Sequence, residues 1–218
     1  MIVPEVSKLP ICDSQAFRAF VEVIVSGDSK SATRLLSASP HLVKERAARG
    51  AIRQDPEENF FDRIKHYIYQ GDTALHMAAA AKQTRIVEEL ISRGAEVRAR
   101  NRRGAEPLHY AVDGGPGSPV WDPNAQTMII ARLIRAGADP NAIDKSGVTP
   151  LHRAVRNRCA AAVRALIEGG ADPLVPNGSG STPILLARLN TGKSGSGSPG
   201  AKEQQREILR ILKEQGAT

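Results

Sequence analysis

The chain has 218 residues, of which 41% are hydrophobic but only 4% aromatic, and its 30 Lys and Arg exceed 23 Asp and Glu to give a formal net charge of +7. No stretch approaches the ~18 apolar residues of a membrane-spanning helix, and the first ten residues lack the basic start and apolar run of a secretory signal. We therefore expect a cytoplasmic protein without membrane contact, whose small apolar residues favour a core of closely packed helices.

Residues 1–50 contain two amphipathic segments that predict a pair of short helices. Their apolar residues recur at helical spacing, with Phe17, Phe20, Val21 and Ile24 on the first segment and Ala32, Leu35 and Leu36 on the second. Each segment has one apolar face. We expect the two helices to pack on each other and on the part of the chain that follows.

Residues 51–70 form an insertion that holds more than half of the Phe and Tyr residues of the chain. Loops of this length in compact proteins are usually functional or disordered, and the aromatic residues argue against disorder. One interpretation is a short helix through Phe60, Ile64 and Ile68 that packs on the fold. The alternative is a binding loop whose outward-facing residues are Phe61, Tyr67 and Tyr69.

From Thr73 onward a tetrapeptide recurs, as Thr73-Ala74-Leu75-His76, Glu106-Pro107-Leu108-His109, Thr149-Pro150-Leu151-His152 and Thr182-Pro183-Ile184-Leu185. His76 and His109 are 33 residues apart, as are His152 and Leu185, whereas His109 and His152 are 43 apart. A fixed period of this size is typical of stacked-repeat proteins. The longer interval predicts an insertion, which falls between Asp113 and Ala125.

Each repeat is predicted to contain two helices. Thr before Pro is a helix start, because Thr accepts from free backbone amides and Pro at the first helical position loses no hydrogen bond. A Gly-Ala-Glu or Gly-Ala-Asp sequence then ends the second helix. The boundaries give a degenerate N-terminal capping repeat at 1–50, the aromatic insertion at 51–70, repeat 1 at 71–103, repeat 2 at 104–146 with its inter-helix insertion, repeat 3 at 147–179, and a C-terminal capping repeat with a Gly/Ser-rich insertion at 180–218.

These residues resemble the ankyrin repeat, whose pattern runs Gly-x-Thr-Pro-Leu-His, two small residues, a second helix, Gly-Ala-Asp and a hairpin finger. The resemblance is specific from Gly71 to about Ser179 and looser to Thr218, because Leu185 stands where His is expected. It implies an all-α, helix-turn-helix solenoid with hairpin fingers and about five helix pairs. It also implies that the recurring His ties finger to helix by hydrogen bonds.

Ankyrin-like proteins bind other proteins through their concave face and fingers, so the resemblance implies an interaction module without catalysis or cofactor. Its partner-facing positions are two residues before each finger Gly, one after it, and two near the end of the first helix. In this chain they are Tyr69, Gln70, Asp72, Ala80 and Ala81; Arg102, Arg103, Ala105, Asp113 and Gly114; and Lys145, Ser146, Val148, Arg156 and Asn157.

The densest basic run lies in the finger at residues 98–103, where Arg98, Arg100, Arg102 and Arg103 occur together. One interpretation is that these arginines only form a solvated surface. The alternative is that they attract a partner with an acidic segment. Nucleic acid is a less favoured partner, because no row of aromatic residues accompanies them. Trp121, in the repeat 2 insertion, either clamps that loop or anchors a partner.

Three other motifs resemble metal, nucleotide-binding or catalytic sites but do not meet the requirements of those sites. His76, His109 and His152 recur once per repeat, so they stand ~10 Å apart, whereas zinc ligands lie ~2 Å from one ion. The segment Ala187–Ser194 matches a relaxed phosphate loop, but its start lies in a predicted helix instead of following a strand. Ser118 lacks the Gly of a nucleophile elbow. We expect no metal, no cofactor and no catalytic residue.

Two alternatives to a protein-binding module stay open. A basic surface could bind nucleic acid without sequence preference, with an affinity that falls steeply with salt. A small enzyme, or a regulatory subunit of one, could hold its chemistry in the 51–70 insertion if Asp62, His66 and Asp72 converged in a closed cleft. The two cysteines, Cys12 and Cys159, lie too far apart in a rod-like stack to form a disulfide.

Overall fold

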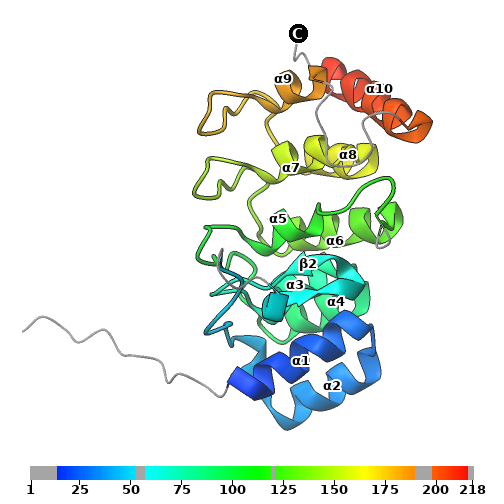
Figure 1. Cartoon of the computed structure of the whole chain (residues 1–218). Coiled ribbons are helices and arrows are strands. Elements are labelled where there is room, and N and C mark those ends of the chain that lie inside the picture. The colour runs from blue at the N-terminus through cyan, green and yellow to red at the C-terminus, as the bar shows by residue number, and fades with distance from the viewer. Residues whose placement is uncertain (1–13, 53–56, 119–120, 190–197, 216–218) are drawn as a thin grey trace, which may run out of the picture.

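The computed structural model describes residues 14–52, 57–118, 121–189 and 198–215. Within these ranges the helices form five successive pairs that stack one above another (Figure 1). The pairs are α1 (Ser14–Ser26) with α2 (Ser29–Ala38), α3 (Ala74–Ala80) with α4 (Thr84–Ser92), α5 (Pro107–Ala111) with α6 (Pro123–Arg135), α7 (Pro150–Arg156) with α8 (Ala160–Glu168), and α9 (Pro183–Arg188) with α10 (Pro199–Glu214). The predicted all-α solenoid of five helix pairs is confirmed.

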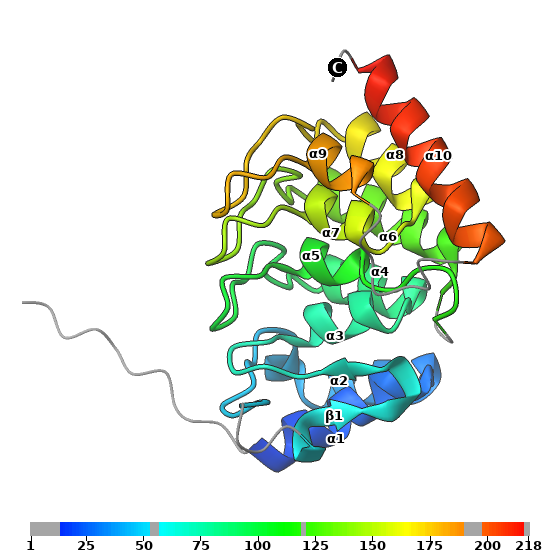
Figure 2. The same ribbon diagram turned by 45° about the horizontal axis from the view of Figure 1, so that its top comes forward.

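The stack has two layers of helices and one edge of projecting loops. The first helices pack on one another, as α3 on α5 and α7 on α9, and the second helices do likewise, as α4 on α6 and α6 on α8. The core lies between these layers. The loops that join one pair to the next extend to one side as the fingers, so that fingers and first helices border one surface (Figures 1 and 2).

The helix ends follow the predicted signals. Thr149 Oγ1 accepts from the His152 amide at 3.3 Å and Pro150 follows as the first helical residue. At the other end, Gly94 and Gly170 have φ of +84° and +92°, a left-handed conformation that residues with a Cβ adopt at a cost. These two glycines therefore allow the chain to leave α4 and α8 and enter the fingers.

The recurring histidines form a ladder across the stack. Their Nε2 atoms donate to a carbonyl of the following finger, with His76 bonded to Ala105 at 3.1 Å, His109 to Val148 at 3.0 Å and His152 to Ser181 at 2.9 Å. Their Nδ1 atoms accept from the amides of Thr73, Glu106 and Thr149, at 3.1, 3.1 and 3.2 Å. The structural role predicted for these histidines is confirmed.

Burial controls the charge of the ladder. It lowers the pKa of all three histidines, and that of His109 falls to about 4 with a further contribution from the charge of Arg153. A neutral ring with one donor and one acceptor nitrogen is the form that satisfies both bonds. The ladder is therefore made of neutral imidazoles.

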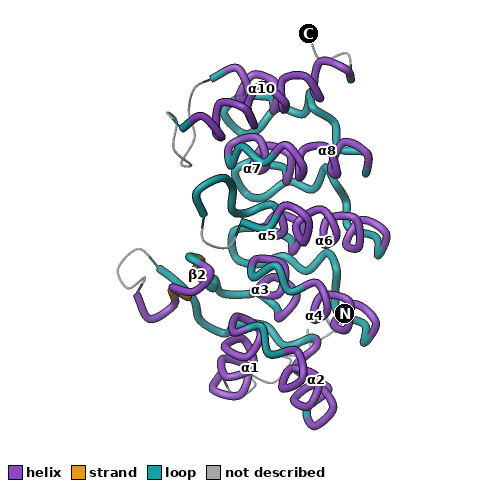
Figure 3. Tube along the Cα trace, turned by 90° about the vertical axis from the view of Figure 1, so that its right-hand side faces the viewer, coloured by secondary structure: helices purple, strands orange, loops and turns teal. Residues whose placement is uncertain are grey.

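The aromatic insertion is a hairpin instead of a helix. Two short strands, β1 (Phe60–Phe61) and β2 (His66–Tyr67), pair antiparallel beside α3 (Figure 3). Between them lies a single 3-10 turn, η3 (Asp62–Ile64), followed by Lys65 in the left-handed region at φ 50°. The prediction of a helix through Phe60, Ile64 and Ile68 is wrong, because Phe60 pairs with Tyr67 across the two strands, where their ring centroids lie 4.7 Å apart.

Several predictions fall outside the described residues or are only partly tested. Cys12 and most of the Ala187–Ser194 motif lie outside them, as does most of the Gly/Ser-rich insertion. Cys159 is a buried free thiol. Trp121 is partly buried and packs against the hydrophobic core, which agrees with a clamp on the repeat 2 insertion. In the part of the chain that the structure describes, no helix has both the length and the apolarity to cross a bilayer.

Candidate functional site

A groove of about 920 Å³ runs along the fingers and first helices. Successive fingers contribute to its wall, because they project from the same edge (Figure 2). The insertion supplies Lys65, His66 and Tyr69, and α5 with its finger supplies Arg103 and Asp113. The levels above supply Ser146, Arg153, Arg156, Asn157, Asn177, Ser179 and Ser181. The groove therefore spans several repeats along the stack.

Most of the predicted partner-facing residues meet here. Those that line the groove are Tyr69, Arg103, Ala105, Asp113, Gly114, Ser146, Val148, Arg156 and Asn157. Arg102 and Lys145 border a smaller adjoining hollow of about 480 Å³, which shares Tyr69, Arg103, Asp144 and Ser146 with the groove. Gln70 is exposed, whereas Ala80 and Ala81 are buried.

Asp72 does not face a partner, and that prediction is wrong. Its side chain is 0% exposed. Its Oδ2 accepts from the Tyr69 amide at 2.6 Å and from the Tyr110 hydroxyl at 3.0 Å, and its Oδ1 accepts from Asn101 Nδ2 at 2.8 Å. Asp72 therefore binds the insertion to repeat 2 from inside the fold.

The aromatic residues of the insertion are divided between core and surface. Phe61 is 8% exposed and belongs to the core, with the Arg18 guanidinium 5.1 Å above its ring. The prediction that Phe61 contacts a partner is therefore wrong. Tyr67 is half-buried between Phe60 and Tyr69. Only Tyr69 of these rings lines the groove.

A charged network lies on the groove wall. Asp113 Oδ2 is 3.0 Å from His66 Nε2 and 3.5 Å from Arg153 Nη1, and Arg153 Nη2 donates to Asp144 Oδ2 at 3.1 Å. Burial alone would raise the pKa of Asp113, but the hydrogen bond from His66 and the charges of Arg153 and Lys82 lower it to about 2. Asp113 therefore stays ionised, with its charge matched within the fold.

Lys82 supports this network from the buried side. Its Nζ donates to the carbonyls of Ala111 at 3.0 Å and of Ala79 and Tyr110 at 3.3 Å. Burial lowers its pKa to about 8, while the charge of Asp113 acts in the opposite direction. This lysine closes the carbonyl ends of α3 and α5, which places Asp113 at the start of the repeat 2 insertion.

The arginines of the finger at residues 98–103 separate into two pairs. Arg98 and Arg100 lie 3.7 and 3.1 Å from the carboxylate of Glu106, which is 1% exposed, and Arg98 also bonds Asp139 at 3.2 Å. Arg102 and Arg103 have no carboxylate partner among the described residues. They contact Tyr69 instead, with guanidinium carbons 5.8 and 4.9 Å from its ring centroid.

The residues proposed for a catalytic cluster do not converge. Asp62 pairs with Lys65 in the hairpin turn, His66 bonds Asp113, and Asp72 is enclosed by Tyr69, Asn101 and Tyr110. Their neighbours differ, and of the three only His66 lines the groove, while none borders the smaller hollow. In the described ranges the structure also has no cluster of three or more His, Cys, Asp and Glu side chains that could hold a metal ion.

Sequence reasoning missed several residues of the groove. Arg153 and Asp144 were not predicted, although Asp144 opens its finger in a position to accept from the Ser146 and Val148 amides, at 2.8 and 3.1 Å. Lys65 and His66 were assigned to a loop or to a catalytic cluster. The polar side chains of Asn177, Ser179 and Ser181 extend the groove to the next finger.

Comparison with known proteins agrees with the geometry. A family model for three copies of the ankyrin repeat matches residues 24–118, and one for many copies matches residues 133–187. A stretch of 59 residues is 42% identical to the mitochondrial disaggregase of Rattus norvegicus, covering 27% of this chain and 9% of that protein. Ankyrin repeats are generally protein–protein interaction modules and typically non-catalytic. With its stacked helix pairs, fingers and histidine ladder, this chain belongs to the ankyrin repeat proteins.

Proposed function

We propose that this protein binds an extended, acidic segment of another protein in the groove along its fingers. The single observation that carries the proposal is the set of exposed cations at the groove and its adjoining hollow, Arg102, Arg103, Lys145 and Arg156, which have no carboxylate partner in the described ranges. Such charges attract an acidic partner from a distance and orient it on approach.

The carboxylates of the groove support this choice of partner. Asp113 is matched by His66 and Arg153, and Asp144 is bonded by Arg153 and by two backbone amides. Burial would raise the pKa of Asp144, but these hydrogen bonds lower it below its ordinary value. Both negative charges are therefore already compensated, and the uncompensated charge that a ligand meets is positive.

The remaining groove residues suit an extended backbone. Asn177, Ser179 and Ser181 offer side-chain donors and acceptors at the upper fingers, and each can bond a peptide amide or carbonyl. The fingers are held by the histidine ladder before any partner arrives. Little conformational entropy would then be lost on binding, which favours a rigid surface over a loop that must order.

A peptide display experiment tests the proposal. A library of random peptides is selected on the full chain and on a variant that carries Lys145→Glu and Arg156→Glu. We expect enrichment of Asp and Glu on the native chain and about a tenfold or greater loss of affinity for the selected peptides on the variant, as for lost charge-assisted contacts. Enrichment of neutral or basic peptides would contradict the proposal.

The matched control carries the same change of charge on the outer helices. Arg85 lies on α4 and Arg135 on α6, and both are exposed. The variant with Arg85→Glu and Arg135→Glu should keep native affinity. An equal loss in both variants would show that net charge, and not the groove, attracts the peptides.

A further inference from the structure

We propose that the smaller hollow beside the groove binds a phosphoryl group carried by the partner segment, an inference that rests on the proposed function. The hollow has a volume of about 480 Å³ and is bordered by Tyr69, Arg102, Arg103, Asp144, Lys145 and Ser146. It lies between two successive fingers, because the Lys145 amide donates to the Arg103 carbonyl at 2.9 Å.

The charge around the hollow matches a phosphate. Arg102, Arg103 and Lys145 supply three cations, and Asp144 is the one carboxylate that borders it. Asp144 is already occupied, since Oδ2 bonds Arg153 and Oδ1 accepts two backbone amides. A phosphoryl group carries about −1.5 to −2 charges at neutral pH. The three cations exceed what a single carboxylate of the partner would need.

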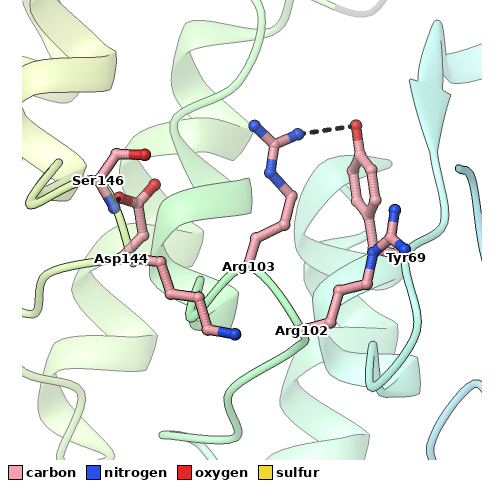
Figure 4. Close-up of a pocket in the computed structure, with 6 residues that line it drawn as sticks. Tyr69, Arg102, Arg103, Asp144 and Ser146 are labelled. Atoms are coloured by element: carbon pink, nitrogen blue, oxygen red, sulfur yellow. Dashed lines mark hydrogen bonds between the residues drawn. The ribbon is translucent and has the colours of Figure 1, made fainter. Parts of the chain in front are cut away.

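Two of the cations are held in place before binding. Arg103 Nη1 donates to the Tyr69 hydroxyl at 3.0 Å (Figure 4), and Arg102 donates to the Ala51 carbonyl. Both guanidinium groups also lie within 6 Å of the Tyr69 ring centroid, at 4.9 and 5.8 Å, close enough for a cation–π contact. Planar guanidinium groups in fixed positions favour bidentate bonds to phosphate oxygens over a diffuse attraction.

The other wall of the hollow completes the set of donors. Ser146 lies on the facing finger together with Asp144, opposite Arg103 (Figure 4). Lys145 precedes Ser146 in the chain and also borders the hollow. Arg98 and Arg100 of the same finger are bound to Glu106. Of the four arginines in this finger, the two without a carboxylate partner in the described ranges, Arg102 and Arg103, both border the hollow.

The surroundings favour a phosphorylated protein over nucleic acid or a membrane. A nucleic acid backbone would follow the groove past Asp113, Asp144 and the neutral residues Asn177, Ser179 and Ser181. Beyond the hollow, Lys65 and Arg153 of the lining are already paired with carboxylates, so Arg156 alone of the described lining cations could meet its further phosphates. Tyr69 already contacts two guanidinium groups, so its ring is not a free platform for a base. One cluster of cations beside a polar groove fits one phosphate on a peptide.

The first experiment follows the backbone amides of the full chain by NMR during titration with phenyl phosphate, with benzoate as the carboxylate control. We expect saturable shifts of the Arg103 and Ser146 amides with phenyl phosphate and weaker shifts with benzoate. Lys145→Gln tests the site without touching the fold, since no described residue bonds this side chain. Unchanged spectra, or equal responses to both compounds, would overturn the proposal.

The second experiment compares a degenerate phosphoserine and phosphothreonine peptide library with its unphosphorylated counterpart on the intact chain. We expect about a tenfold preference for phosphorylated peptides, and its loss in the variant with Arg102→Gln and Arg103→Gln. The variant with Arg85→Gln and Arg135→Gln has the same net charge and should keep the preference. Equal enrichment of both libraries on the native chain would overturn the phosphate site.

The outcomes separate this inference from the proposed function. Unphosphorylated acidic peptides that bind with full affinity, and lose it with Lys145→Glu and Arg156→Glu, would leave the acidic groove standing while the phosphate site falls. Tighter binding to single-stranded DNA, or to vesicles that contain phosphorylated phosphatidylinositol, would overturn the assignment to a protein phosphate if the same arginine variant abolished it. If neither acidic nor phosphorylated peptides bound to the groove or to the hollow, both proposals would be overturned.

Discussion

The two ends of the finger at residues 98–103 have similar composition and different roles. Arg98 and Arg100 compensate the buried carboxylate of Glu106, next to the amide that bonds His109. Arg102 and Arg103 border the hollow beside the groove and contact a tyrosine in place of a carboxylate. The comparison shows that the number of basic residues in a finger does not measure its attraction for a partner, because part of that charge is used inside the fold.

The largest expected effect is a loss of stability at acidic pH. It arises at His109, which bonds the Glu106 amide beside Arg98 and Arg100. Unfolded histidine binds a proton near pH 6.5, whereas folded His109 does so only near pH 4. The unfolded state therefore binds more protons between these values, and stability falls as the pH falls through this window. We expect a loss of about 2 kcal/mol from His109 at pH 5 relative to pH 7, with further losses from His76 and His152.

Urea unfolding at several pH values measures this loss. The variant His109→Gln should be less stable at pH 7 and should show a shallower dependence on pH, because one of the three titrating groups is gone. Stability that stays constant between pH 7 and pH 5 would contradict the neutral ladder.

A smaller effect is expected from the helix cap at the inner end of the finger. Glu106→Ala removes the cap of α5 and the partner of Arg98 and Arg100, and should lower the free energy of unfolding by about 1–2 kcal/mol. Glu106→Thr introduces the residue found at this position in repeats 1 and 3 and should cost less. It also leaves Arg100 without a carboxylate partner, while Arg98 keeps Asp139, so we expect tighter binding of acidic peptides by this variant.

Denaturant unfolding and peptide titration of both variants test the cap. A Glu106→Thr chain that is as unstable as Glu106→Ala would show that the buried carboxylate itself, and not the cap, stabilises the finger.

The smallest effect on stability is expected at the outer end. Replacing Arg102 and Arg103 with Glu should abolish binding of acidic peptides. It should lower stability by only ~1 kcal/mol or less, as is usual for exposed charged groups. Circular-dichroism melts beside peptide titrations measure the two quantities. A loss of stability as large as that of Glu106→Ala would remove the distinction between the two ends of the finger.

The sequence was sufficient for the stack of helix pairs and for the ladder. The tetrapeptide with its helix cap and the apolar spacing of the second helices are local signals, and each repeat contacts mainly its neighbours. The resemblance to the ankyrin repeat, and not these local signals, indicated Arg103, Ser146 and Arg156, which line the groove. The proposed cytoplasmic location stays a prediction.

What could not be predicted depends on contacts between repeats. Asp72 follows a finger glycine, so its position alone favoured exposure, but Asn101 from the end of its own repeat and Tyr110 from the next repeat enclose it. The spacing of Phe60, Ile64 and Ile68 suits a helix, yet the pairing of Phe61 with His66 closes a hairpin. Arg153 joins carboxylates of two levels, a pairing that no local pattern reveals.

The ladder also gives the stack a direction. Each histidine donates to a carbonyl of the following level, ending with His152 on Ser181, and Leu185 makes no such bond. Shortening the chain from its C-terminal side would strip an acceptor from a buried donor at every step, whereas shortening it from the other side would leave the remaining donors paired. Removal of repeats from the C-terminal side should therefore destabilise the remaining stack more than removal from the N-terminal side.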